Sequence, residues 1–240
     1  MKKQYKLASI ASIVVILVIV GCVLAFAGEG SEFHLLLRKK KMTDIGGAIA
    51  ESFQAGQDVI VAYVDGTPIY QNEVSLKRTL NQASYDFITH DPTYGKTYAG
   101  LVTLMTDDEI LAEIVQFKLI EKAAEKAGII VTDEEARERA RGAPQESDAE
   151  AERSAERRES SELNEVFLKG LGMTSEEYIN SIGAQIARET MIKTQYVVWF
   201  CQKEMNKRQE DSKYVPQNYT EHLDELLKAA DFRLAVAKDD

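Results

Sequence analysis

The chain has 240 residues, of which 39 are acidic and 29 basic, so its formal net charge is -10 at pH 7. This length suffices for one domain with attached segments or for two small domains. The acidic balance argues against nucleic-acid binding, which needs a basic face to neutralise phosphates, and the two cysteines lie in segments that predict no intrachain disulfide.

Residues 1–27 predict a cytoplasmic tip and a membrane segment. Three lysines precede Leu7–Ala27, which contains no charged residue and would rise about 31 Å as a helix, close to the hydrocarbon thickness of a bilayer. Because a signal-peptide core is shorter, roughly 7–15 residues, we favour an uncleaved anchor over a cleaved signal. The residues Ile19–Cys22 resemble a bacterial lipoprotein cleavage box, but the apolar run continues beyond Cys22, which disfavours lipidation there.

Charge alone leaves the orientation of this segment open, because the basic cluster Arg38–Lys41 lies beyond its other end. The N-terminal lysines lie immediately next to the apolar run, and the segment looks like an export signal. We therefore expect a single pass through a bacterial cell membrane with the C-terminal body outside the cytoplasm. Residues 28–58 are interpreted as a juxtamembrane stalk, partly helical from Thr43 to Phe53. A solvated stalk is favoured over docking of the basic cluster on anionic lipid.

The folded body, residues 59–240, begins with Val59–Tyr70. In this stretch Asp65-Gly66 separates two apolar runs, which predicts a β-hairpin because its turn requires positive φ angles. A helix follows at once, and Asn72 is its expected N-cap because Tyr70 has no suitable side-chain acceptor.

Three helix starts carry the same Thr-x-x-Glu capping box, at Thr106, Thr132 and Thr174. The first opens a helix to about Ala127 whose apolar residues recur every three or four positions, so we expect it to be the central core helix. Gly128 suits the left-handed conformation that ends a helix.

Residues 132–162 contain no large apolar side chain, and we expect a solvated helix, a mobile loop or both. A long helix is predicted from Ser175 to about Arg208, spanning the domain or projecting from it. After Pro216, the pattern predicts a short helix over Tyr219–Ala229 and a final strand over Phe232–Val236.

The sequence offers little catalytic chemistry. Its three histidines are dispersed without a second ligand at metal-binding spacing, and no nucleophile elbow or phosphate-binding loop is present. Cys201 follows Trp199 and Phe200 and is interpreted as a core thiol rather than a nucleophile. We therefore expect no metal, no cofactor and no enzymatic activity.

Four motifs now stand in order: the hairpin, the helix end at Ala124–Ile129, the link Val131–Glu135 and the box Gly172–Tyr178. Together they resemble the N-terminal chaperone domain of the SurA and PrsA families of bacterial extracytoplasmic folding factors. The resemblance covers about Val59 to Val236. It implies a mainly α-helical fold with a small sheet made by the N-terminal hairpin and the C-terminal strand. Only residues 209–218 lie where the families insert a parvulin-type prolyl isomerase domain, so no isomerase activity is expected.

Together with the apolar segment Leu7–Ala27, the resemblance leads us to expect a membrane-tethered chaperone, a holdase that binds unfolded or nascent exported polypeptides in an apolar helical cradle. Aromatic and Met side chains suit such contacts because they adapt to many partner sequences. The alternative is a non-enzymatic assembly subunit with one dedicated envelope partner. The identity of the clients and the oligomeric state stay open. The candidate client-binding residues, each also interpretable as core, are Tyr85, Phe87, Phe117, Phe167, Tyr178, Met191, Tyr196 and Trp199.

Overall fold

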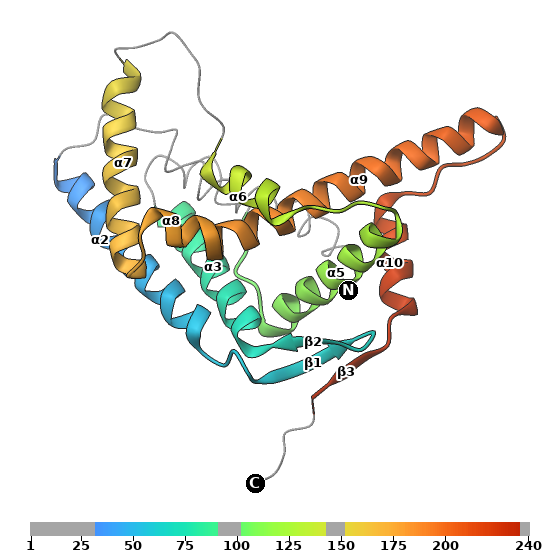
Figure 1. The fold of residues 1–240 in the computed structure, drawn as a ribbon, viewed down its shortest axis with the longest axis horizontal. Helices are drawn as coiled ribbons and strands as arrows, with labels where there is room; N and C mark the ends of the chain where they lie inside the picture. Colours follow the sequence, from blue (N-terminus) through green and yellow to red (C-terminus); the bar gives the residue numbers. More distant parts are fainter. Residues whose placement is uncertain (1–31, 91–101, 143–151, 236–240) are drawn as a thin grey trace.

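A computed structural model describes residues 32–90, 102–142 and 152–235 as a mainly helical fold with one three-stranded antiparallel sheet (Figure 1). The predicted fold class is confirmed. Within these three ranges no helix is both long and apolar enough to cross a bilayer. The predicted membrane segment, Leu7–Ala27, lies outside the described residues.

The predicted hairpin consists of β1 (Ile60–Val64) and β2 (Thr67–Tyr70), which pair antiparallel. Asp65 and Gly66 have φ angles of 49° and 81°, so both central turn residues are left-handed, as the twist of a two-residue hairpin requires. The final strand β3 (Phe232–Leu234) returns to pair with β1, and the strand order is β2-β1-β3.

The hairpin turn is fastened to the chain's C-terminal end. The Asp65 N–H donates to the Asp231 carbonyl and the Asp231 N–H donates to the Asp65 carboxylate, both at 2.9 Å. The Lys122 ammonium lies 3.1 Å from the same carboxylate. The N–H of Asp231 and the charge of Lys122 lower the pKa of Asp65. These contacts hold together segments 166 residues apart.

Helix α3 (Gln71–His90) starts two residues earlier than a cap at Asn72 would place it. Tyr70 precedes it, and the Glu73 carboxylate accepts from the Tyr70 N–H at 3.1 Å. The prediction that Asn72 caps this helix is wrong. Glu73 supplies the acidic half of a capping box, and that half requires no acceptor on the side chain at the cap position.

Helix α5 (Asp107–Lys126) is the central core helix, as predicted. Both hydrogen bonds of the Thr106 capping box are present, and Gly128 has a φ of 77°. Helix α5 contributes to two apolar clusters. Ile110 belongs to the cluster that packs against the sheet, and Ile120 belongs to the cluster formed with the later helices.

Helix α2 (Glu32–Gln54) occupies most of the segment interpreted as a stalk, and it packs along α7 (Glu152–Leu171) and against α3 (Figure 1). Met42 and Ile49 are only 3% and 2% exposed. The segment therefore differs from the expected spacer, because it buries one face of a helix in the fold. Close contact with α7 is possible because Gly46 meets Gly170 without side chains between them.

Helix α6 (Asp133–Arg141) opens at the Thr132 box and buries Ala136. The Thr174 box opens a continuous helical path through α8 (Ser175–Tyr178), the π-helical turn η2 (Ile179–Gly183) and α9 (Ala184–Glu210). Figure 1 shows the end of α9 projecting from the body, one of the two arrangements expected.

Helix α10 (Tyr219–Ala229) has the predicted bounds, and Asn218 caps it by accepting from the Thr220 N–H at 2.8 Å. The loop before it is held by Glu204, whose carboxylate accepts from the Tyr214 hydroxyl at 2.6 Å and the Gln217 N–H at 2.8 Å. The Lys207 ammonium, which donates to the same carboxylate at 2.7 Å, and these two hydrogen bonds lower the pKa of Glu204 to about 2.

Cys201 is exposed, so its interpretation as a core thiol is wrong. Successive residues of an α-helix point about 100° apart. Phe200 is buried at 3% exposure, and the next position turns Cys201 onto the outer face of α9.

Candidate functional site

A groove lies where α3, α5 and α9 converge. Its buried apolar lining comes from Leu76 and Ile114, and the half-buried side chains of Leu80, Phe117 and Ile186 complete it. The cavity measures about 160 Å³, below the roughly 300–1,000 Å³ of pockets that enclose a small-molecule ligand. Its size fits individual side chains of a bound chain better than a cofactor.

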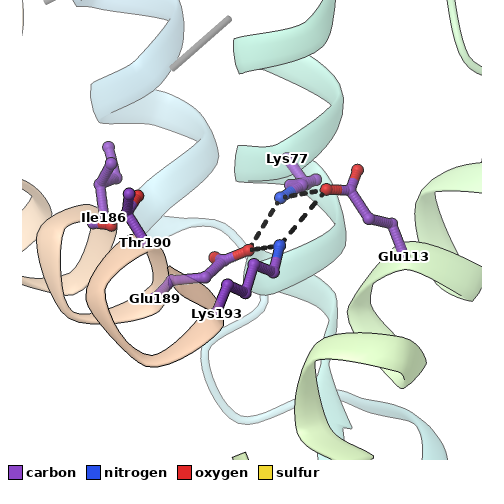
Figure 2. A network of polar contacts seen from close by, with 6 residues as sticks. All are labelled: Lys77, Glu113, Ile186, Glu189, Thr190 and Lys193. Carbon is purple, nitrogen blue, oxygen red and sulfur yellow. Dashed lines mark hydrogen bonds and ion pairs between the residues drawn. The ribbon is translucent and has the colours of Figure 1, made fainter. Parts of the chain in front are cut away.

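Four charged residues, here called the charge cluster, join the three helices beside this groove (Figure 2). Lys77 of α3 lies 3.0 Å from Glu113 of α5 and 3.1 Å from Glu189 of α9. Lys193, one turn beyond Glu189, lies 2.5 Å from Glu189 and 3.6 Å from Glu113. Each ammonium thus faces both carboxylates, and the four charges sum to zero.

Lys77 and Glu189 of the charge cluster favour their charged forms although both are largely buried. Burial by itself would lower the pKa of Lys77, but the negative charges of Glu189 and Glu113 outweigh burial and raise it. Burial would likewise raise the pKa of Glu189, but Lys77 and Lys193 lower it to about 2. A proton donor or acceptor works best with a pKa near the working pH, so neither group is suited to proton transfer at neutral pH.

The other charges along the groove are also paired across helices. Glu73 of α3 lies 2.8 Å from Lys118 of α5, and Glu121 of α5 lies 2.5 Å from Arg188 of α9. The Lys193 ammonium stands 5.3 Å from the ring centre of Phe117, within cation–π range. Because these charges bind one another, the groove presents apolar surface framed by neutralised ion pairs.

The candidate client-binding residues divide among different regions. Phe117, Met191, Tyr196 and Trp199 come together in the cluster between α5, α9 and α10. Phe117 is the member of this set that also lines the groove. Tyr196 is 2% exposed, stacks on Trp199 at 5.4 Å and shares a 2.7 Å hydrogen bond with the Nε2 atom of His222. Tyr196 therefore serves the core.

Phe167 and Tyr178 form a separate edge-to-face pair, with ring centres 5.8 Å apart, in the cluster of α2, α3 and α7. Tyr85 is half-buried on α3. The side chain of Phe87 lies outside the described residues. The structure thus brings the seven candidates whose side chains it describes into no single surface, and the role of all eight in client binding stays a prediction.

The sequence-based reasoning missed Leu80 and Ile186 and all four members of the charge cluster. One signal was present: Glu113 interrupts the apolar face of α5 between Ile110, Ile114 and Phe117. A charge at such a position predicts a buried partner. Nothing in the local pattern identifies Lys77 or Lys193 as that partner. In the part of the chain that the structure describes, no group of His, Cys, Asp and Glu residues could hold a metal ion.

The profile of the SurA-like N-terminal domain matches residues 2–192 of the chain. The chain belongs to this family. The resemblance inferred from the hairpin and the capping boxes is confirmed. No curated protein and no solved structure matches the chain.

The matched range of this SurA-like chain begins well before Val59, where the body was expected to start. It includes α2, in agreement with the packing of that helix on α7 and α3. The SurA-like N-terminal domain is a non-catalytic chaperone module, and no parvulin domain is indicated in this chain. The family thus implies binding of unfolded polypeptides.

Proposed function

We propose that this chain is a membrane-tethered holdase that binds unfolded segments of exported proteins outside the cytoplasm, without prolyl isomerase activity. The observation that carries the proposal is the groove of a SurA-like domain in which the charges are paired internally and Leu80, Phe117 and Ile186 stay half-exposed. Such a surface attracts apolar side chains and demands no particular sequence.

The size of the groove favours weak and reversible binding. Burying one Val, Leu, Ile or Phe side chain contributes about 1.5–3 kcal/mol, and the ordering of a flexible chain subtracts from that gain. Because each contact is weak, a client dissociates readily from the groove. A holdase needs such dissociation, since its clients must leave in order to fold.

Aggregation of a denatured client protein tests this proposal. Full-length protein in nanodiscs should suppress light scattering, whereas empty nanodiscs should not. Ile186→Asn should weaken suppression because it places an amide in the groove. The matched control is Val198→Asn on the same helix, where the side chain is 59% exposed and does not line the groove. Equal activity of both variants, each folded by circular dichroism, would contradict a role for the groove.

The tether is the second part of the proposal and rests on Leu7–Ala27. An intact anchor should leave the protein in the membrane fraction after alkaline carbonate extraction. The mass of the extracted protein should equal that of the full chain, with no added lipid at Cys22. Protease added outside intact cells or spheroplasts should digest the body. Release by carbonate, or a mass equal to that of a chain beginning at residue 28, would refute an uncleaved anchor.

A dedicated assembly subunit is the competing function. The exposed stripe of Val198, Cys201 and Met205 on the C-terminal half of α9 favours it, because Val198 and Met205 are 59% and 61% exposed. Photo-crosslinking in cells separates the two functions. Many unrelated exported proteins crosslinked from position 186 support the holdase, whereas one stoichiometric partner crosslinked from position 198 supports the assembly subunit.

A further inference from the structure

The start of α2 carries an apolar and basic outer face. Leu36 and Leu37 are 64% and 50% exposed, and Lys40, one turn farther on, is exposed as well. With 3.6 residues per turn, these three side chains fall within an arc of about 100°. The opposite face of the helix, which includes Met42 and Ile49, is buried.

The chain length ties this face to the proposed membrane anchor. Helix α2 begins at Glu32, five residues after Ala27, where the uncharged run ends. Five extended residues span at most about 17 Å, and the helical rise from Glu32 to Leu36 adds about 6 Å. Leu36 therefore cannot lie far from the bilayer in which Leu7–Ala27 is proposed to stand. A tether this short makes contact effectively intramolecular.

The distribution of charge makes the start of α2 the part of the body that best suits an anionic bilayer surface. Residues 29–240 carry a net charge of -13, so an anionic bilayer repels most of the body. The run Arg38–Lys41 is a local exception. Lys39 is bound to Glu162 at 2.6 Å and Lys41 donates to the Asp86 carbonyl at 2.5 Å, while Lys40 stands on the same outer face as the two leucines.

We propose that the outer face of α2 formed by Leu36, Leu37 and Lys40 docks on the surface of an anionic bilayer. The leucines enter the boundary between headgroups and acyl chains, and Lys40 lies among anionic headgroups, the arrangement of an interfacial amphipathic helix. This inference rests on the tether proposed above. Since α2 packs on α3, which lines the groove, docking holds the groove at a fixed height above the membrane.

Spin-label accessibility in the full chain tests this docking. Cys22→Ser and Cys201→Ser remove the native thiols. A nitroxide attached at Leu36→Cys keeps an apolar side chain at this docking position. In nanodiscs with anionic lipid, the label at position 36 should collide often with oxygen and rarely with a water-soluble nickel chelate. A label on Lys213→Cys, an exposed site in the loop before α10, should show the reverse. Nickel access at 36 equal to that at 213 overturns the proposal.

A matched pair of variants tests the specificity of the contact. Leu37→Ser should raise nickel access at position 36, whereas Leu104→Ser should not, although both leucines are 50% exposed. Lys40→Gln should raise nickel access at position 36 in anionic nanodiscs and should change it little in zwitterionic nanodiscs. Equal effects of Leu37→Ser and Leu104→Ser would refute docking through this face.

Carbonate extraction of membranes from cells that express the same variants separates the two proposals. Protein that resists extraction but shows a nickel-accessible label refutes the docking and leaves the tether standing. Protein released by carbonate refutes both. Suppression of client aggregation reports on the holdase independently of either result.

Discussion

The contact between α2 and α7 depends on two glycines, and a third glycine beside them provides a matched control. A Cβ atom added at Gly46 would stand 2.3 Å from the Phe167 carbonyl oxygen and 2.8 Å from the Leu171 nitrogen. A Cβ atom at Gly170 would stand 2.2 Å from the Thr43 carbonyl oxygen. These neighbours are backbone atoms, so the helices themselves must move apart. At Gly47 the nearest atom would be 3.8 Å away, an ordinary contact.

The expected magnitudes follow from two opposing effects. Alanine in place of glycine inside a helix stabilises it by about 1 kcal/mol, and this gain applies at both positions 46 and 47. Overpacking costs about 1–3 kcal/mol, occasionally more, and applies only at Gly46. We expect Gly46→Ala to destabilise the fold by up to about 2 kcal/mol, which corresponds to a melting temperature lower by up to roughly 8 °C for a protein of this size. Gly47→Ala should be neutral or stabilising.

The assay is thermal unfolding of the full chain in mild detergent, followed by far-ultraviolet circular dichroism. Hydrogen exchange should also accelerate in α2 and α7 of Gly46→Ala relative to α5, because the loss of packing is confined to the first pair of helices. Gly170→Ala should behave like Gly46→Ala. If Gly46→Ala melts at or above Gly47→Ala, the close approach of α2 and α7 is refuted.

Three further outcomes test the core. Glu113→Gln should destabilise the fold by about 3 kcal/mol because it leaves two buried ammonium groups with one carboxylate, and Lys77→Met added to it should recover part of the loss in urea unfolding; no recovery would refute the pairing. Unfolding free energy should fall between pH 4.5 and about 2, because the pKa of Glu189 is lowered to about 2 in the folded chain and its stabilisation, complete above the unfolded value, is lost as the carboxylate is protonated. Glu189→Gln should have a shallower slope in that interval, and an identical slope would contradict this source. Tyr196→Phe should cost about 1 kcal/mol through loss of the hydrogen bond to His222, and unchanged stability would argue that this bond contributes nothing.

The features that the sequence alone determined are held by groups close together in the chain. A capping box closes within three residues, as at Thr106, and the Asp65-Gly66 turn needs only its own φ angles. The helix bounds of α10 follow from Asn218 at one end and a change of pattern at the other. The one wrong cap prediction, at the start of α3, also concerned a local contact: the Glu73 carboxylate accepts from the Tyr70 N–H although Tyr70 offers no side-chain acceptor in return.

The features that only the tertiary structure decided depend on which faces of distant helices meet. In the sequence, Gly46 and Gly170 are ordinary helix residues. In the structure their backbones are in contact, which allows α2, in the segment expected to be a stalk, to pack on α7. Cys201 shares the apolar neighbourhood of Phe200 in sequence but faces outward, because the rotation of α9 is set by its partners. The charge cluster joins residues 77, 113, 189 and 193, and no local pattern assigns one lysine to a glutamate on another helix. Local hydrogen bonds specify where helices begin and end, whereas packing energy is shared among surfaces that the chain brings together only on folding.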